Sequence, residues 1–296
     1  MAVSIADLVR AGGRSYSFEF FPPKTDAGEQ VLWETIRALE PLQPSFVSVT
    51  YGAGGTTRDR TVRLTGRIAA ETDLLPVAHL TCVGASRTEL VEIVGDYVDA
   101  GVHHVLALRG DPPAGVGSPW ISHPGGLEHA DELVALVKSQ GDFTVGVAAF
   151  PEGHPEAVDL AEDASVLRAK QDAGADFAVT QFFFDAKDYF RLLDRADAAG
   201  VTIPIIPGIM PVTNVGQMER FAELSGAAFP VALAERFHAV ADDPTAVIDL
   251  GVEVATHMCE ELLAGGAPGL HFYTLNRSTA TIRVFAALGL GGQSSV

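Results

Sequence analysis

One carboxylate stands out near the N-terminus, in residues 15–23, SYSFEFFPP. The aromatic and apolar residues predict a strand, and the two prolines end it because proline has no N–H for a sheet ladder. Glu19 is therefore expected one or two residues before a strand end. Burial among aromatic neighbours disfavours the charged form of a carboxyl group, so we expect a raised pKa and a proton that can be donated near neutral pH. A structural carboxylate paired with an arginine is the alternative.

Three further motifs carry residues that could do chemistry. Residues 109–112, RGDP, join a guanidinium and a carboxylate to a glycine that permits close approach, although a turn held by an Arg–Asp pair has the same sequence. Asp163 and Lys170 share one face of a predicted helix, which alone is typical of a solvated surface. Gln181 precedes a run of phenylalanines, where a buried amide needs partners in a ligand or in a neighbouring strand.

Several common enzyme signatures are absent. Residues 115–117, GVG, lack the third glycine of a dinucleotide fingerprint, and the sequence has no phosphate-loop, HExxH or GxSxG motif. A Rossmann-type site is therefore not expected. No metal site is expected either, because these histidines have no partners at metal-ligand spacing: His103, His104, His123 and His129.

Apolar runs alternate with segments of helical spacing along the whole chain. The first strand ends before Pro22, and further strands are predicted at 46–51, 75–82, 103–108, 144–150, 177–183, 203–208 and 269–273. Helices are predicted at 28–40, 57–72, 86–100, 128–139, 157–173, 186–199, 214–225, 244–264 and 278–288, with an irregular stretch between the helices 214–225 and 244–264.

Strict alternation of strand and helix predicts a parallel sheet, and eight units predict a single-domain α/β protein, a (β/α)8 TIM barrel over residues 1–296. An open doubly wound sheet is the alternative. In a barrel all strands end at one mouth, which should gather the polar residues at the strand ends: Glu19, Thr50, His79 or Thr81, Arg109 with Asp111, Gln181, and Tyr273 with Asn276 and Arg277. Aromatic residues at the same ends suit a flat heteroaromatic ligand.

Composition excludes several classes of partner. The chain has 38 acidic and 20 basic residues and a formal net charge of −18, which argues against nucleic acid and anionic membranes. A phosphate-bearing ligand would need local cations or backbone N–H groups. Cys82 and Cys259 alone imply no disulfide framework, and no signal peptide or membrane span is recognisable, so a soluble cytoplasmic protein is expected.

Eight ordered stretches resemble the methylenetetrahydrofolate reductase family, in its bacterial single-barrel form. They are 18–24 (FEFFPPK), 49–53 (VTYGA), 79–82 (HLTC), 108–111 (LRGD), 148–156 (AAFPEGHPE), 180–185 (TQFFFD), 206–211 (IPGIMP) and 271–277 (HFYTLNR). The resemblance implies a flavoenzyme in which NAD(P)H reduces FAD and hydride then passes to 5,10-methylenetetrahydrofolate, giving 5-methyltetrahydrofolate. It implies ping-pong exchange in one pocket, and it allows a homo-oligomer.

The resemblance also implies roles for individual residues. Glu19 falls on the acid that helps to open the five-membered ring of the folate, and Asp111 on the acid beside the flavin and pterin. The implied flavin contacts are Thr50, His79, Arg109, Gly110, Asp111, Ala130, Phe150, His154, Asp163 and Lys170. The implied folate or nicotinamide contacts are Glu19, Gln181, Gln217, Phe221 and Arg277.

Four positions depart from the family pattern near the flavin. Phe150 and His129 replace tyrosines, and Val166 and Ala169 replace polar or basic residues, which removes hydrogen bonds to FAD. Three alternatives therefore stay open. They are the same reduction by direct hydride transfer from NAD(P)H, a non-catalytic folate- or flavin-binding partner in methyl transfer, and a deazaflavin-dependent pterin reductase.

Overall fold

The computed structural model describes residues 5, 7, 13–51, 58–112, 118–225 and 227–290. Within them lie the strands β1 (Ser15–Phe20), β2 (Phe46–Val49), β3 (Pro76–Thr81), β4 (His104–Leu108), β5 (Thr144–Ala149), β6 (Phe177–Phe182), β7 (Ile205–Ile209) and β8 (Gly269–Tyr273). The helices are α2 (Asp26–Leu39), α3 (Arg58–Glu71), α4 (Arg87–Asp99), α5 (Ala130–Ser139), α6 (Leu160–Asp172), α7 (Ala186–Ala198), α8 (Val215–Ser225), α9 (Val231–His238), α10 (Pro244–Ala264) and α11 (Thr279–Ala287). A short 3-10 helix, η1 (Glu40–Leu42), follows α2.

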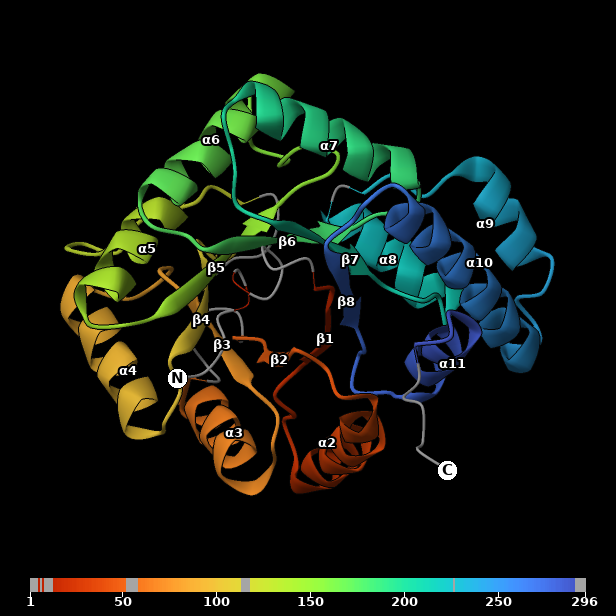
Figure 1. Cartoon of the computed structure of the whole chain (residues 1–296), viewed down its shortest axis with the longest axis horizontal. Coiled ribbons are helices and arrows are strands. Elements are labelled where there is room, and N and C mark those ends of the chain that lie inside the picture. The colour runs from red at the N-terminus through yellow and green to blue at the C-terminus, as the bar shows by residue number, and fades with distance from the viewer. Residues whose placement is uncertain are drawn as a thin grey trace.

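The strands form one closed parallel barrel in sequence order, with the helices outside it (Figure 1). Closure comes from the pairing of β8 with β1, in which Ser17 lies opposite His271 and Glu19 opposite Tyr273. The predicted (β/α)8 barrel is confirmed. The open doubly wound sheet is wrong, because an open sheet would leave these two strands as unpaired edges.

Short polar side chains fix where several outer helices begin. Thr25, Asp159 and Asp185 accept hydrogen bonds from the first backbone N–H groups of α2, α6 and α7. Ser86 forms a reciprocal capping box with Glu89 at the start of α4. These contacts satisfy N–H groups that the first turn of a helix leaves unpaired. Each cap thereby sets the point at which the chain turns back along the outside of the barrel.

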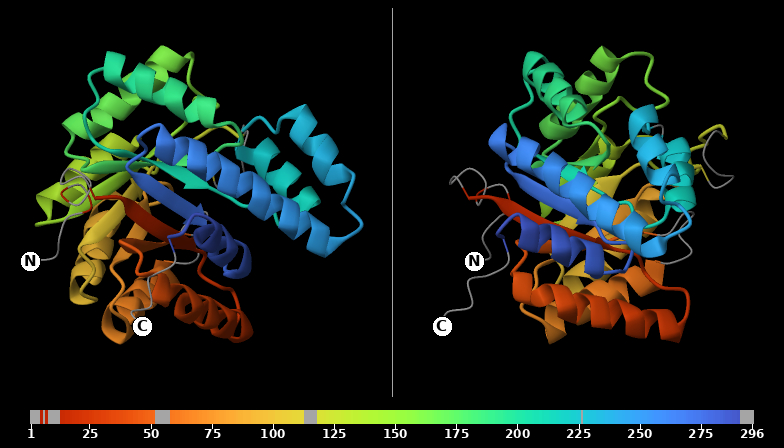
Figure 2. Two further views of the ribbon diagram at one scale, coloured as in Figure 1. Left: turned by 45° about the vertical axis from the view of Figure 1, so that its right-hand side comes forward. Right: turned by 90° about the vertical axis from the view of Figure 1, so that its right-hand side faces the viewer.

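The stretch between α8 and α10, predicted to be irregular, contains the helix α9. Phe237 of α9 is fully buried, and its ring lies 6.1 Å from that of Phe229. The helix has eight residues and Phe237 is its one buried side chain, so no periodic pattern identifies it in the sequence. Figure 2 shows α9 beside α10, away from the barrel strands. There Phe237 joins an apolar cluster that includes Phe182 and Met210 at the ends of β6 and β7.

Alternating side chains give each strand an outer and an inner face. On β1, Phe18 and Phe20 are fully buried in the core between strands and helices, and the Phe18 ring lies 5.2 Å from that of Phe285. Ser17 and Glu19 lie on the inner face of the same strand. A separate apolar cluster fills the barrel interior toward the other end, made of Ile5, Phe46, Val77, Leu106, Phe177, Val179 and Ile206. Glu19 therefore lies between this cluster and the barrel mouth.

Candidate active site

Glu19 is buried inside the barrel, with 5% of its surface exposed. Strand register places Ser48 beside it on β2 and Tyr273 beside it on β8. Its backbone carbonyl accepts hydrogen bonds from both the side chain and the backbone N–H of Thr274, at 2.6 and 3.3 Å. The pairing of β1 with β2 and β8 thus fixes where Glu19 lies in the barrel.

Three side chains converge on a single oxygen of Glu19, Oε2. Nε2 of His271 lies 3.3 Å away in hydrogen-bonding geometry, and the Ser48 hydroxyl donates to Oε2 at 3.4 Å. Nε2 of His79 lies at 3.4 Å but is not aligned to form a hydrogen bond. The ionisable side chains beside Glu19 in the described chain are therefore two histidines, rather than the arginine of the structural alternative.

The expectation of a raised pKa for Glu19 is wrong for this structure. Burial pushes the pKa up, but the charge of His79, together with the hydrogen bond and charge of His271, outweighs burial and lowers it to about 2. Sequence reasoning relied on the adjacent aromatic residues. Phe18 and Phe20 point to the opposite face of β1, whereas the histidines come from β3 and β8.

Arg109 and Gly110 directly follow β4. Nη1 of Arg109 pairs with Oε2 of Glu156 at 2.6 Å, and the guanidinium lies 5.2 Å from the centre of the Trp120 ring. Gly110 has φ of +88°, and a Cβ there would lie 2.6 Å from a methyl carbon of Val83, so only glycine fits. Asp111 is exposed, and Glu156 rather than Asp111 is the ion-pair partner of the arginine.

Asp163 and Lys170 are buried, each 8% exposed, which contradicts the solvated surface that their spacing alone suggested. Nζ of Lys170 donates to the backbone oxygen of Ala148 at 2.9 Å and lies 5.9 Å from the centre of the Phe150 ring. Oδ1 of Asp163 accepts from the backbone N–H of His154 at 3.2 Å. The pair lies under the loop that follows β5, because α6 packs there against the barrel.

Burial dominates the acid–base properties of this second group. It lowers the pKa of Lys170 to about 8 and raises the pKa of Asp163. It also lowers the pKa of His154, with a further contribution from the nearby charge of Arg109. All three side chains are therefore shifted toward their neutral forms.

The other predicted contact residues lie at strand ends or on α8. Thr50 follows β2, and Ala130 is the buried first residue of α5. Gln181 is half-buried, and its Oε1 accepts from the N–H of Phe182 at 3.0 Å, which is neither of its two expected partners. Residues from the ends of β5 and β6 and from the segment after α8 line a small cleft: Phe150, Pro151, Glu152, Gly153, Gln181, Phe182, Ser225 and Ala227.

The remaining contact residues come from α8 and from the turn after β8. Gln217 is exposed on α8, while Phe221 packs against the apolar cluster beside β6 and β7. Arg277 is exposed. Asn276 fixes the turn before it, because its side chain accepts from the N–H of Phe21 and donates to the Phe21 carbonyl, at 2.9 and 2.8 Å.

Sequence reasoning missed Ser17, Ser48 and His271 as site residues. A usable signal was present, since Ser17 and Glu19 are two apart on one strand and must share a face, as must His271 and Tyr273. Tyr273 donates to the carbonyl of Thr180 at 2.7 Å. Which inner faces meet, however, depends on strand register.

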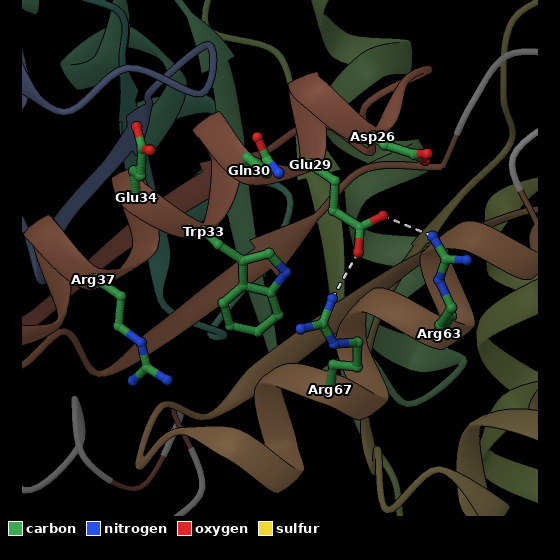
Figure 3. A pocket seen from close by; sticks show the side chains of 8 residues that line it. All are labelled: Asp26, Glu29, Gln30, Trp33, Glu34, Arg37, Arg63 and Arg67. Atoms are coloured by element: carbon green, nitrogen blue, oxygen red, sulfur yellow. Dashed lines mark hydrogen bonds and ion pairs between the residues drawn. The ribbon is translucent and has the colours of Figure 1, made fainter.

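Another pocket lies between α2 and α3 on the outside of the barrel (Figure 3). Glu29 pairs there with Arg63 at 2.7 Å and with Arg67 at 2.6 Å, and the Arg67 guanidinium lies 4.4 Å from the centre of the Trp33 ring. These charges are satisfied within the pocket. We therefore interpret it as a contact that joins the two helices rather than as a catalytic centre.

Searches for membrane spans and metal sites cover only the residues with described coordinates. Among these, no helix is both long and apolar enough to cross a membrane. Likewise, no three or more His, Cys, Asp or Glu side chains of this part of the chain are grouped so that they could hold a metal ion.

Comparison with known proteins gives consistent results. A family model described as methylenetetrahydrofolate reductase matches residues 4–289. The chain is 42% identical over 287 residues to the 5,10-methylenetetrahydrofolate reductase of Pectobacterium carotovorum subsp. carotovorum, covering 97% of this chain and 93% of that relative. It is 43% identical over 279 residues to the 5,10-methylenetetrahydrofolate reductase of Escherichia coli (strain K12), covering 94% and 92%.

The fold is also similar to a solved structure from Clostridium thermocellum, of a protein that binds two copies of 5-methyl-5,6,7,8-tetrahydrofolic acid. The TM-score is 0.62 at 12% identity, with 96% of each chain covered, so this likeness concerns the fold alone. The family model and the bacterial relatives, in contrast, match in sequence over nearly the whole length. The chain therefore belongs to the methylenetetrahydrofolate reductase family.

Proposed function

We propose that this protein is a flavin-dependent enzyme that uses NAD(P)H to reduce 5,10-methylenetetrahydrofolate to 5-methyltetrahydrofolate. The observation that carries the proposal is Glu19, a buried carboxylate with hydrogen-bonding partners at the mouth of a barrel in a chain of this family. The two bacterial relatives are named 5,10-methylenetetrahydrofolate reductases.

The residues around the β4 and β5 ends fit a cofactor such as FAD. Lys170 is a buried cation whose hydrogen bond goes to a neutral carbonyl, and Arg109 adds a second positive charge in a strongly acidic chain. Thr81 Oγ1 and His79 Nε2 are buried polar atoms without hydrogen-bond partners among the described residues. Anionic phosphates and a polar ring system would satisfy such groups.

Arg109 and Lys170 would hold the negatively charged part of FAD, and Gly110 would permit close approach. Further contacts would come from Thr50, His79, Asp111, Ala130, Phe150, His154 and Asp163. FAD, when bound, supplies the two-electron carrier between nicotinamide and folate. Such a site would not need a Rossmann fingerprint, because barrel strand ends rather than a glycine-rich loop would hold the cofactor.

Gln181, Gln217, Phe221 and Arg277 would hold the folate or the nicotinamide. The Oε1 atom of Gln181 is engaged by the N–H of Phe182, which leaves its amide N–H groups for a ligand. Glu19 would donate a proton to the folate to help open its five-membered ring, and Asp111 would orient the ring from the exposed side of the mouth. A pterin that excludes water would raise the pKa of Glu19 toward the range of a general acid.

The substitution Glu19→Gln tests this assignment. We expect folate reduction to fall by about 10²–10⁴-fold, because the amide cannot donate the required proton. NAD(P)H oxidation with a quinone acceptor should stay within about twofold of the wild type, since that reaction does not use this acid. Both rates are measured by absorbance with purified protein, and the flavin absorption spectrum is recorded beside them.

Glu29→Gln, in the pocket between α2 and α3, is the matched control and should leave both rates unchanged. Colourless protein that still reduces folate would overturn the flavin assignment in favour of direct hydride transfer. Equal folate reduction by Glu19→Gln and wild type would overturn the role of Glu19. Extraction of a deazaflavin, identified by its mass, would replace FAD as the cofactor.

A further inference from the structure

Glu19 is the outer member of a row of three buried side chains. The Ser17 hydroxyl lies 2.8 Å from Nδ1 of His271, and Nε2 of His271 lies 3.3 Å from Oε2 of Glu19. Ser17 is completely buried, and His271 and Glu19 are 1% and 5% exposed. Both ring nitrogens of His271 are therefore engaged inside the barrel. The proposed reaction, as described above, gives this histidine no role.

Strand register and packing hold His271 in this orientation. Ser17 is its direct neighbour across the β1–β8 pairing. The imidazole ring stacks on Phe46, with centres 5.7 Å apart and planes 19° apart, and meets the Tyr273 ring edge-on at 5.3 Å. Two hydrogen bonds and two aromatic contacts restrict the ring and keep Nε2 directed at the carboxylate.

We propose that His271, oriented by Ser17, is a positioning residue that aims Glu19 and returns a proton to it. The proposal rests on the proposed function, because it needs Glu19 to act as the acid. The acid that acts on the folate is then the Glu19–His271 pair. A histidine that is itself oriented by a third side chain follows the same logic as the base of a catalytic triad.

The proton balance of this pair is closed and requires no oxidant or reductant. The N–H bond at Nε2 breaks as the O–H bond at Oε2 forms, and that O–H bond then breaks as an N–H bond forms on the folate. The step starts from a doubly protonated His271 beside an ionised Glu19, so it leaves His271 neutral and Glu19 ionised again. Because His271 has almost no contact with solvent, its next proton must come from water at the mouth, through Glu19, after the product has left.

Other titratable groups also face Glu19. His79 on β3 is 3.4 Å away, and burial together with the charge of Glu19 keeps the pKa of Tyr273 well above its ordinary value, so the phenol stays neutral. His79 is not aligned to form a hydrogen bond with the carboxylate, whereas His271 is. Coupled groups of this kind titrate together, so a pH profile reports the cluster and not one residue.

The test compares His271→Gln, Ser17→Ala and the control His104→Gln. Glutamine can still hydrogen-bond to Glu19 but cannot pass on a proton. His104 is a buried histidine at the start of β4 and has no part in the proposed site. Folate reduction and NAD(P)H–quinone oxidoreduction are measured for each variant between about pH 5 and pH 9 with the flavin-loaded protein.

We expect His271→Gln to lower folate reduction by about tenfold or more and to displace its pH profile, while the quinone reaction changes less than about twofold. Ser17→Ala should displace the profile in the same direction with a smaller loss. His104→Gln should match the wild type. In a Glu19→Gln background, His271→Gln should not lower the rate of folate reduction further, because the two residues act as one unit. Infrared difference spectra should show a protonated Glu19 carboxyl on addition of 5-methyltetrahydrofolate to the wild type, and less of it with His271→Gln.

Three results would overturn the proposal. They are a His271→Gln pH profile that superimposes on the wild type, an equal loss in both reactions, which indicates a structural role, and full additivity with Glu19→Gln. Failure of the proposed function itself has another signature, since the wild type would not reduce folate or Glu19→Gln would leave that rate intact. If His271→Gln does not fold, as judged by thermal unfolding, Ser17→Ala and the infrared comparison still decide the question.

Discussion

Glu19 and Lys170 are both buried ionisable side chains of the same barrel, but their surroundings affect their charged forms in opposite ways. The inner faces of β2, β3 and β8 supply Glu19 with Ser48, His79 and His271, and its pKa falls to about 2. Lys170, beside β5, has a backbone carbonyl as its hydrogen-bond partner, and burial lowers its pKa to about 8. The first charge is stabilised by the fold, and the second is disfavoured by it.

This difference shows what each region is organised to do. A charge that the protein itself satisfies stabilises the folded state, and a buried cation without a carboxylate partner costs stability. Asp163 is also shifted toward its neutral form by burial. Groups held at such a cost are commonly found in functional sites, which agrees with an anionic ligand beside Lys170. The following variants are designed to break or sharpen the contrast.

The largest expected effect is on the acid stability of Glu19→Gln. The pKa of Glu19 is lowered in the folded state from 4.5 to about 2. The ionised carboxylate therefore stabilises the folded protein fully above pH 4.5, and this contribution is lost as the pH falls through 2. We expect the wild type to exceed the variant by at most about 3 kcal/mol at neutral pH, with the difference vanishing toward pH 2. Urea unfolding at a series of pH values measures it. A difference independent of pH would show that the histidines do not stabilise the carboxylate.

Lys170→Met should change the free energy of unfolding in the opposite direction from Glu19→Gln, by stabilising the folded protein. The folded-state pKa is lowered from 10.5 to about 8, so the wild type gains stability as the pH rises from 8 to 10.5. Removing the amine should stabilise the protein at pH 7 by roughly 2 kcal/mol, after allowance for the lost hydrogen bond to Ala148. FAD affinity, followed by flavin fluorescence, should fall about tenfold. A variant less stable than the wild type at pH 7 would remove the contrast with Glu19.

Asp163→Asn is expected to change stability less. Burial raises the folded-state pKa of Asp163, so its ionisation lowers stability as the pH rises above the ordinary value of 3.8. Asparagine keeps an oxygen that can accept from the N–H of His154. We expect a variant that equals or exceeds the wild type at pH 7, within about 1 kcal/mol, by thermal unfolding. A loss of several kcal/mol would mean that ionised Asp163 is well satisfied.

The smallest change in the free energy of unfolding is expected for Glu29→Gln, the control outside the barrel. Glu29 pairs with Arg63, whose side chain is 60% exposed, and with Arg67, whose side chain is 38% exposed. Such pairs contribute about 0–1 kcal/mol and are screened by salt. Unfolding at low and high salt measures the change, which should shrink at high salt. An effect as large as that of Glu19→Gln would show that burial does not separate the two sites.

Most of the fold could be predicted from the sequence because strand and helix periods repeat along the chain. Alternation of faces places Glu19 on the opposite face of its strand from Phe18 and Phe20, and Gly110 takes the positive φ that follows β4. The short helix α9 could not be predicted, because one buried side chain gives no period. The predicted direction of the Glu19 pKa shift is wrong, because His79 and His271 are distant in sequence and lie close to Glu19 only across the barrel.

The amino-acid sequence by itself determined the order of the strands and of the helices other than α9, and its motifs determined the family. These properties are local, since they follow from residue types and short spacings. Only the tertiary structure decided that β8 closes against β1, that Glu156 rather than Asp111 pairs with Arg109, and that Lys170 is buried. The physical reason is that burial and electrostatic environment depend on which strands and helices meet, and this is fixed only when the barrel closes.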